Sequence, residues 1–249
     1  MNIDHDFNTA KERAASSLKS RSGIGTQKER ILHATLKYFF EPDEAYHEIK
    51  IGRFFADINK GDAIVEIQTR NFNLLKNKLT EFLENHSVTI VYPIISTKWL
   101  SWVDAATGEL SKPRRSPKSE TIYYAYDELY KIKMFLNEPN LYFAFVFLDV
   151  DERRLLNGWS KDKKKGSHRM DRIPLKINDI VEINCIDDYI KMFPDNLPDQ
   201  FTVKDFASAS HINRRISTLA LNILNHIGAV KRVGKSGNAF LYKKCLQRY

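Results

Sequence analysis

Cysteine is nearly absent from this sequence of 249 residues, which contains only Cys185 and Cys245. The two lie far apart and no Cys-x-x-Cys spacing occurs, so the sequence argues against a disulfide framework and against a cysteine-based zinc site. So little cysteine is typical of proteins in a reducing compartment. We therefore expect a cytoplasmic protein.

Long apolar runs are also missing. No stretch approaches the roughly 18 consecutive apolar residues that a membrane span requires. The opening residues, MNIDHDFNTAKERAASS, are polar and mixed in charge, unlike a signal peptide. Hydrophobic residues still make up 43% of the chain, enough for a core of ordinary size. These features predict a soluble protein that does not contact a membrane.

Acidic residues are outnumbered: 39 lysines and arginines face 31 aspartates and glutamates, which gives a formal net charge of +8. An excess of this size fits a phosphate-rich partner, because Lys and Arg displace condensed counterions from nucleic acid. A merely basic soluble protein is the alternative. The distribution of the charges along the chain has to decide between them.

The length suggests one larger domain and one smaller one, at roughly 100–200 residues per domain. Pro194 and Pro198 mark a linker, and the composition changes on either side of it. We divide the chain into a basic lead-in over 1–24 with a short helix over 10–18, an α/β core over 25–155, a basic connecting segment over 156–197 and a small C-terminal domain over 198–249.

The core begins with a helix from Thr26, where Glu29 completes a capping box, to about Phe40. The apolar spacing then predicts strands and helices in this order: two strands over 46–58 around Gly52, a strand over 63–69, a helix over 72–85, a strand over 88–93, a helix over 120–136, and strands over 141–150 and 173–183. The strand–helix–strand unit favours a parallel pair. The fold class expected is α/β, with a mixed central sheet flanked by helices.

The last fifty residues resemble a winged helix-turn-helix. A short entry and a first helix over 201–207 are followed by a second helix over 213–226, which Gly228 ends, and by a basic hairpin over 229–242. The cations expected to bind nucleic acid in this domain are Arg214, Arg215, Lys231, Arg232 and Lys235. A protein-interaction module with solvated charges is the alternative.

Two further basic stretches precede this domain. Arg114, Arg115 and Lys118 form one of them, and a lysine cluster over 161–165 forms the other. Each is expected to contact phosphate or to be a solvated loop.

Three polar residues on neighbouring strands form the candidate catalytic site. Alternation places Glu66 and Gln68 on one face of a strand, and Asp57 ends the preceding strand. Such a site is rich in oxygen atoms and suits Mg²⁺, which takes one or two carboxylates, waters and a substrate phosphate. The alternative to a metal site is an aspartate in an ordinary turn beside two polar residues on a solvated sheet face.

The stretch GRFFADINKGDAIVEIQTRNF, with its flanking elements, resembles the PD-(D/E)XK nuclease superfamily, which has the restriction-endonuclease-like fold. The resemblance covers about residues 26–95 and implies Asp57 and Glu66 as metal ligands. It implies Glu29 of the first helix as a third ligand, with Glu48 as a rival. The usual motif ends in Lys, and Gln68 stands there instead; Gln can orient a water by hydrogen bonding but supplies no charge.

The run of EIQTRNF, VYPI, the tryptophans, RRSPK and the C-terminal hairpin looks similar to a group of uncharacterised bacterial proteins. The function expected is a nuclease dependent on Mg²⁺ or Mn²⁺ that hydrolyses phosphodiester bonds of DNA, positioned by the C-terminal winged helix. RNA stays open as a substrate, and a homodimer stays open as the assembly. The alternatives are a non-catalytic DNA-binding or regulatory protein, and an interaction module of a defence or repair assembly with a degenerate nuclease core.

Overall fold

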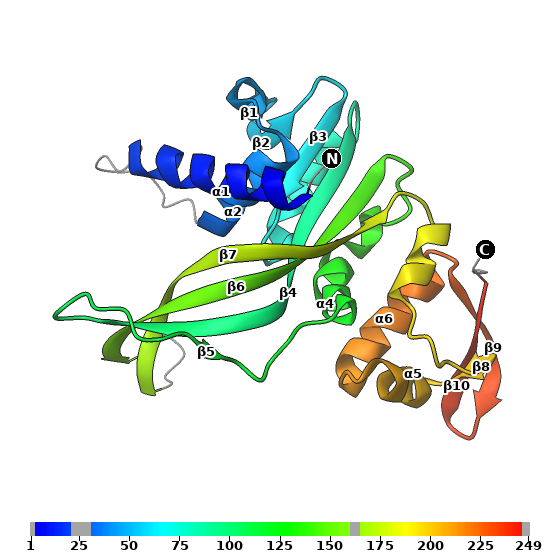
Figure 1. The fold of residues 1–249 in the computed structure, drawn as a ribbon. Helices are drawn as coiled ribbons and strands as arrows, with labels where there is room; N and C mark the ends of the chain where they lie inside the picture. The colour runs from blue at the N-terminus through cyan, green and yellow to red at the C-terminus, as the bar shows by residue number, and fades with distance from the viewer. Residues whose placement is uncertain (1–2, 21–30, 160–164, 246–249) are drawn as a thin grey trace.

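The computed structural model describes residues 3–20, 31–159 and 165–245. Its centre is a mixed seven-stranded sheet in the order β1-β2-β3-β4-β6-β7, with the short β5 paired to β4. Helices cover both faces of this sheet, α1 and α2 on one and α4 on the other (Figure 1). The expected α/β fold with a mixed, helix-flanked sheet is therefore confirmed. None of the described helices is long and apolar enough to cross a membrane.

The strands of the sheet are β1 (His47–Ile51), β2 (Phe54–Asn59), β3 (Ala63–Ile67), β4 (Ser87–Asp104), β5 (Arg114–Arg115), β6 (Leu141–Trp159) and β7 (Lys165–Ile183). The helices of this domain are α1 (Ile3–Ser20), α2 (Ile31–Phe40), α3 (Lys76–Phe82) and α4 (Ala125–Leu129), with 3₁₀ helices η1 (Glu44–Tyr46), η2 (Phe72–Leu75), η3 (Ile122–Tyr124), η4 (Tyr130–Phe135) and η5 (Asp187–Met192). The predicted β1–β2 hairpin and the parallel β3–β4 pair are both present.

The N-terminal segment differs from the expected lead-in. Residues 3–20 form one continuous helix, α1, instead of a short helix over 10–18. Phe7, Ala10 and Ala14 are buried against α2 and the sheet, and the Phe7 ring meets Phe39 edge to face at 5.8 Å. The buried stripe consists of one large side chain and two alanines, which is too weak a helical pattern to reveal this packing in the sequence. The expected start of α2 at Thr26 lies outside the described residues.

Two strands are longer than expected: the strands predicted over 141–150 and 173–183 extend into the charged residues between them, as β6 and β7. β6 and β7 pair antiparallel from Phe143↔Ile183 out to Trp159↔Lys165, and β4 runs parallel to β6 over most of its length. In Figure 1 the outer ends of these strands extend past the helices as a twisted ribbon. A strand that no helix covers needs no alternation of apolar residues. The charged residues here therefore gave no strand pattern in the sequence.

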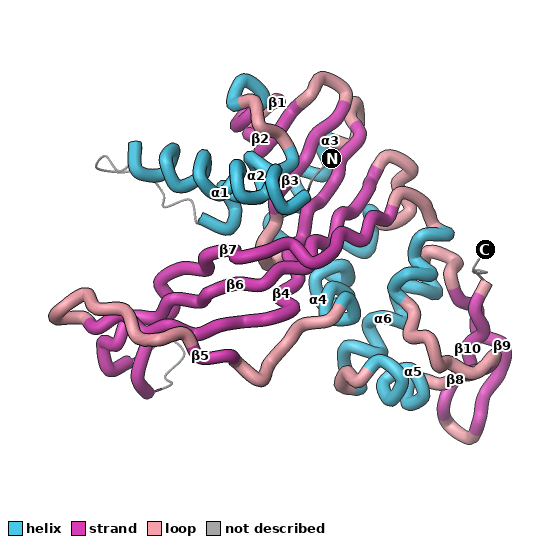
Figure 2. The backbone as a smooth tube through the Cα atoms, in the orientation of Figure 1, coloured by secondary structure: helices cyan, strands magenta, loops and turns pink. Residues whose placement is uncertain are grey.

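The C-terminal unit contains β8 (Gln200–Phe201), α5 (Val203–Ser210), α6 (Arg214–His226), β9 (Val230–Ser236) and β10 (Ala239–Lys244), with strand order β8-β10-β9. Thr202 and Asp205 form a capping box at α5, and Asn213 caps α6. Phe206 packs against Tyr126 of α4, so the unit shares one apolar core with the sheet domain. Figure 2 shows its helices beside α4 and its hairpin farther out.

Candidate functional site: a buried carboxylate pair

Asp57 and Glu66 lie on the neighbouring antiparallel strands β2 and β3. The register Ile58↔Val65 makes them the next facing pair along the two strands. The main-chain N–H of Asp57 donates to Oε1 of Glu66 over 3.2 Å. Asp57 is 9% exposed and Glu66 is 2% exposed. The structure therefore brings the two predicted metal ligands together in a buried position.

Two side chains from helices complete the surroundings of this carboxylate pair. Nε2 of His33, on α2, lies 3.2 Å from Oδ2 of Asp57, which also accepts the main-chain N–H of Ile67 over 2.7 Å. Nζ of Lys78, on α3, donates to Oε2 of Glu66 over 2.8 Å. Sequence reasoning missed both residues. Neither has a diagnostic spacing, because each meets its carboxylate only through tertiary packing.

The two carboxylates have opposite pKa shifts. Burial, then the negative charge of Asp57, raises the pKa of Glu66 to about 7, although Lys78 opposes both effects. Burial also favours the neutral form of Asp57, but the hydrogen bond and charge of His33, the Ile67 amide and Lys78 outweigh it. The pKa of Asp57 is therefore lowered. At neutral pH the pair holds Asp57 ionised and Glu66 partly protonated, a state that a nearby cation would shift toward two negative charges.

Gln68 and the two other candidate glutamates lie differently. β3 ends before Gln68, whose side-chain amide donates to the carbonyls of Arg70 and Asn71, the latter over 3.2 Å. The Gln68 side chain therefore stabilises the loop that follows β3. Glu48 accepts a 2.6 Å hydrogen bond from the buried Lys37, and Glu29 lies outside the described residues. Among the described histidines, cysteines, aspartates and glutamates, no three form a ready-made metal shell.

One of the three basic residues that were predicted to bind nucleic acid in the core lines a large cavity. Arg114 and Arg115 are exposed on β5, at the edge of β4. Lys118 lines a cavity of about 750 Å³ between β4, α4 and the start of α6. Arg215 lines the same cavity, and its guanidinium lies 2.7 Å from Oδ1 of Asp127 on α4. The lysine cluster over 161–165 falls mostly on residues that are not described.

In the C-terminal unit, the β9–β10 hairpin is more exposed to solvent than helix α6. α6 is buried on two sides, along Ile216 and Ala220 and along Ser217 and Leu221, whereas Arg214 is exposed. The exposed hairpin cations are Lys231, Arg232 and Lys235. The last two of these cations lie 4.2 Å and 5.3 Å from the ring centre of Phe240, which holds them on one side of the hairpin.

Comparison with known proteins places this α/β domain in a family. The family model described as "Domain of unknown function (DUF8091)" matches residues 30–184, more than half of the chain, so the protein belongs to that family. An "Uncharacterized protein" of Treponema pallidum (strain Nichols) is 25% identical over 223 residues, which cover 89% of this chain and 87% of the relative. No solved structure matches significantly. The matched region contains both Asp57 and Glu66.

Proposed function

We propose that this chain is a metal-dependent nuclease of the PD-(D/E)XK type that hydrolyses phosphodiester bonds of DNA. The observation that carries the proposal is the buried pair Asp57–Glu66 on adjacent strands, with the pKa of Glu66 raised to about 7 by burial and by its neighbour's charge. Perturbed, paired carboxylates of this kind cluster at functional sites. The order α2, β1–β2 hairpin, β3, α3, β4 adds support, because it follows the order of elements in the superfamily resemblance.

The donor set suits a hard divalent cation such as Mg²⁺ or Mn²⁺. Asp57 and Glu66 supply two carboxylates, and Mg²⁺ typically completes such a shell with waters and a substrate phosphate. Asp57 and Glu66 would hold the ion, and Glu29 is the predicted third ligand. When bound, the ion lowers the pKa of a water and stabilises negative charge developing on the phosphate.

The chain's own side chains prepare this pair in two ways. His33 and the Ile67 amide fix Oδ2 of Asp57 and keep that carboxylate ionised. Lys78 contacts Oε2 of Glu66 and is 25% exposed, so its ammonium reaches both the carboxylate and the surface. We assign to Lys78 the positive charge that the superfamily motif usually places at the position of Gln68. Water orientation by Gln68 itself stays a prediction.

We propose further that residues 198–249 form a winged helix that binds DNA. The order β8, α5, α6, β9, β10 and the exposed hairpin cations support this assignment. Because α6 is buried on two sides, we assign phosphate contact mainly to the hairpin and to Arg214. Arg215, paired with Asp127, would instead hold the unit against α4. Arg114, Arg115 and Lys118 stay candidate contacts of the core.

One observation favours a second candidate function, a non-catalytic DNA-binding or regulatory protein with a degenerate nuclease core. The amide of Gln68 is used by its own loop, and Oε2 of Glu66 is already paired with Lys78. In this alternative the Glu66–Lys78 pair is structural. If the protein acts within a defence or repair assembly, a partner protein would then supply the catalytic activity.

The deciding experiment is a cleavage assay with the full-length protein. Plasmid, linear duplex, single-stranded DNA and RNA are each incubated with Mg²⁺, Mn²⁺ or EDTA. We expect metal-dependent cleavage by the wild type and none by Glu66→Gln or Asp57→Asn. Glu41→Gln is the matched control, because Glu41 is also buried but pairs with Lys60, outside the carboxylate pair. Cleavage that survives Glu66→Gln, or absence of cleavage of every substrate, would reject the nuclease assignment.

A further inference from the structure

A small basic cavity lies beside the carboxylate pair. It has a volume of about 100 Å³ and is formed by α2, the loop after β3 and the outer part of β7. Its lining residues, which we name the arginine pocket, are Leu32, Thr69, Arg70, Arg169, Asp171 and Arg172. Leu32 directly precedes His33, and Thr69 follows Glu66 by three residues, or about 10 Å of extended chain. The pocket and the carboxylate pair are therefore neighbours.

A buried carboxylate fixes the arginines on the sheet side of this pocket. Glu152 of β6 is 1% exposed, and its Oε2 lies 3.2 Å from Nε of Arg172 and 3.9 Å from the guanidinium of Arg169. Its Oε1 pairs with Arg154 over 2.7 Å. Burial favours the neutral form of Glu152, but the hydrogen bond from Arg154 and the positive charges of Arg172 and Lys98 outweigh it and lower the pKa of Glu152. Glu152 is thus ionised at neutral pH and holds the guanidinium groups in place before any ligand arrives.

The arginines in and beside the arginine pocket outnumber the carboxylates there. Four arginines, Arg70, Arg154, Arg169 and Arg172, lie here with two carboxylates, those of Glu152 and Asp171, so this group of side chains is net positive. Arg70 is exposed and makes no ion pair within the described part of the chain. Guanidinium groups match phosphate oxygens in bidentate geometry. The volume leaves room for a phosphate group.

We propose that the arginine pocket binds a backbone phosphate of the nucleic acid, next to the phosphate that lies at the carboxylate pair. The proposal rests on the proposed function and names the substrate-positioning site for it. Arg70 and Arg172 bind the phosphate oxygens, and Glu152 is a positioning residue that orients Arg172. A nucleic-acid strand bound at both places has its sugar-phosphate backbone aligned along β3 and the loop that follows β3.

The test measures binding without cleavage. A fluorescein-labelled single-stranded 12-mer and a labelled duplex are titrated with full-length protein in EDTA, from 50 to 300 mM KCl. The main variant is Arg70→Gln, because this exposed side chain has no ion pair to lose among the described residues; Arg70→Lys retains the charge. Arg153→Gln is the matched control: Arg153 follows Glu152 on β6 but pairs with Asp151, and strand alternation places both on the face opposite Glu152.

We expect Arg70→Gln to weaken binding about three- to tenfold at 100 mM salt and to reduce the slope of log affinity against log salt by about one. Arg70→Lys should keep most of the slope, and Arg153→Gln should bind as the wild type does. Equal binding by Arg70→Gln and Arg153→Gln would overturn the arginine pocket while leaving the cleavage result for Glu66 intact.

A second arm separates a backbone phosphate from a free one. Inorganic phosphate is added at increasing concentration while thermal unfolding is followed for the wild type and for Arg70→Gln. Stabilisation of the wild type by low millimolar phosphate, with DNA binding unaffected by Arg70→Gln, would overturn the backbone assignment in favour of a small phosphate ligand. Loss of DNA binding in Arg70→Gln, in a protein that cleaves nothing, would support the pocket and reject the nuclease.

Discussion

Glu66→Gln should stabilise the metal-free protein at alkaline pH and not at acidic pH. The pKa of Glu66 is raised from 4.5 to about 7, and each pKa unit corresponds to about 1.4 kcal/mol, so ionising Glu66 in the folded state costs about 3 kcal/mol. Between these pH values the folded protein binds the extra proton and the unfolded chain does not. Stability therefore falls as the pH rises from 4.5 to about 7 and then stays level.

Gln has nearly the same shape as protonated Glu and never ionises. We expect Glu66→Gln to match the wild type at pH 5 and to exceed it by about 1–3 kcal/mol at pH 8, less than the full value because Lys78 loses its partner. The assay is urea unfolding in EDTA at pH 5, 6, 7 and 8, followed by tryptophan fluorescence. Adding Mg²⁺ at pH 8 should stabilise the wild type and leave Glu66→Gln unchanged, because binding to the folded state shifts its stability.

Glu152→Gln is the matched control with the opposite sign. Glu152 is equally buried, but its arginine partners lower its pKa, so its charge stabilises the fold above its unfolded pKa and that contribution fades as the pH falls. Glu152→Gln should therefore be less stable than the wild type at pH 8, with a smaller difference at acidic pH. A gain for Glu66→Gln that is equal at pH 5 and pH 8, or a loss at pH 8, would refute the idea of repelling carboxylates.

Three other changes test separate parts of the structure. Lys78→Gln removes a cation that lowers the pKa of Glu66, so it should slow cleavage and move the acidic limb of the pH–rate profile to higher pH; an unmoved limb would show that Lys78 does not act through Glu66. Replacing the hairpin cations Lys231, Arg232 and Lys235 with Gln should weaken DNA binding and reduce its salt slope by up to about three, and unchanged affinity would favour a protein-interaction module. Phe7→Ala should lower the free energy of unfolding by about 3 kcal/mol, measured in urea, and a negligible loss would contradict the burial of α1.

The sequence predicted the elements that apolar spacing and turn residues define locally. These are the β1–β2 hairpin, β3, the inner part of β4 and the C-terminal helices. The pairing of Asp57 with Glu66 was predicted because a short turn joins their two strands. Local chemistry determined these features, because turn residues and period-two alternation act within a few positions. The parallel β3–β4 pair followed from the helix between them.

Features that depend on distant packing could not be predicted in the same way. His33 reaches Asp57 from a helix 24 positions earlier in the chain, and Lys78 reaches Glu66 from a helix after it. The outer halves of β6 and β7 lacked an apolar pattern because Glu152 is buried among arginines instead of hydrophobic side chains. A buried ionic cluster and a solvated charge run look the same in sequence.

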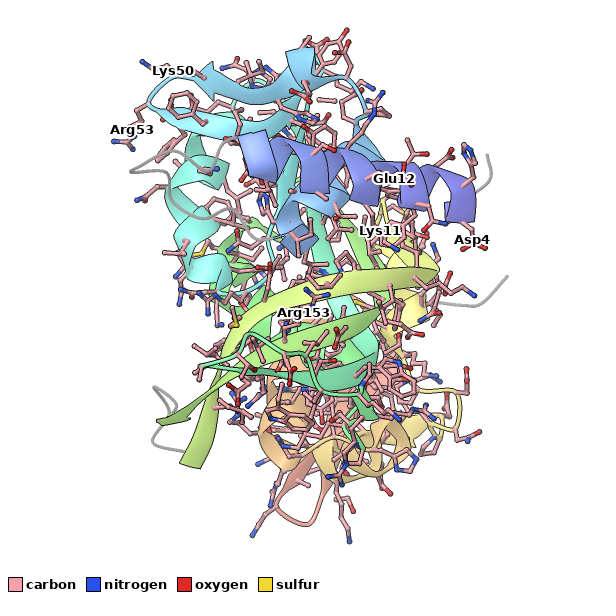
Figure 3. The ribbon with its side chains drawn as sticks, turned by 60° about the vertical axis from the view of Figure 1, so that its left-hand side comes forward. Asp4, Lys11, Glu12, Lys50, Arg53 and Arg153 are labelled. Atoms are coloured by element: carbon pink, nitrogen blue, oxygen red, sulfur yellow. The ribbon has the colours of Figure 1, made fainter. Side chains whose placement is uncertain are left out.

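Helix α1 lies outside the region that matches the family, which begins at residue 30, yet it covers the sheet. Nζ of Lys11 donates to the carbonyl of Leu175 on β7 over 3.3 Å, and Figure 3 labels Lys11 on the side of α1 toward that strand. During synthesis at about 5–20 residues per second, β7 leaves the ribosome roughly ten to thirty seconds after α1. Helix α1 must therefore wait for β7, the last strand of the sheet in sequence, before this contact can form. A fragment trimmed to the family boundary would keep α2 but expose the apolar residues that Phe7, Ala10 and Ala14 cover, and we expect it to aggregate.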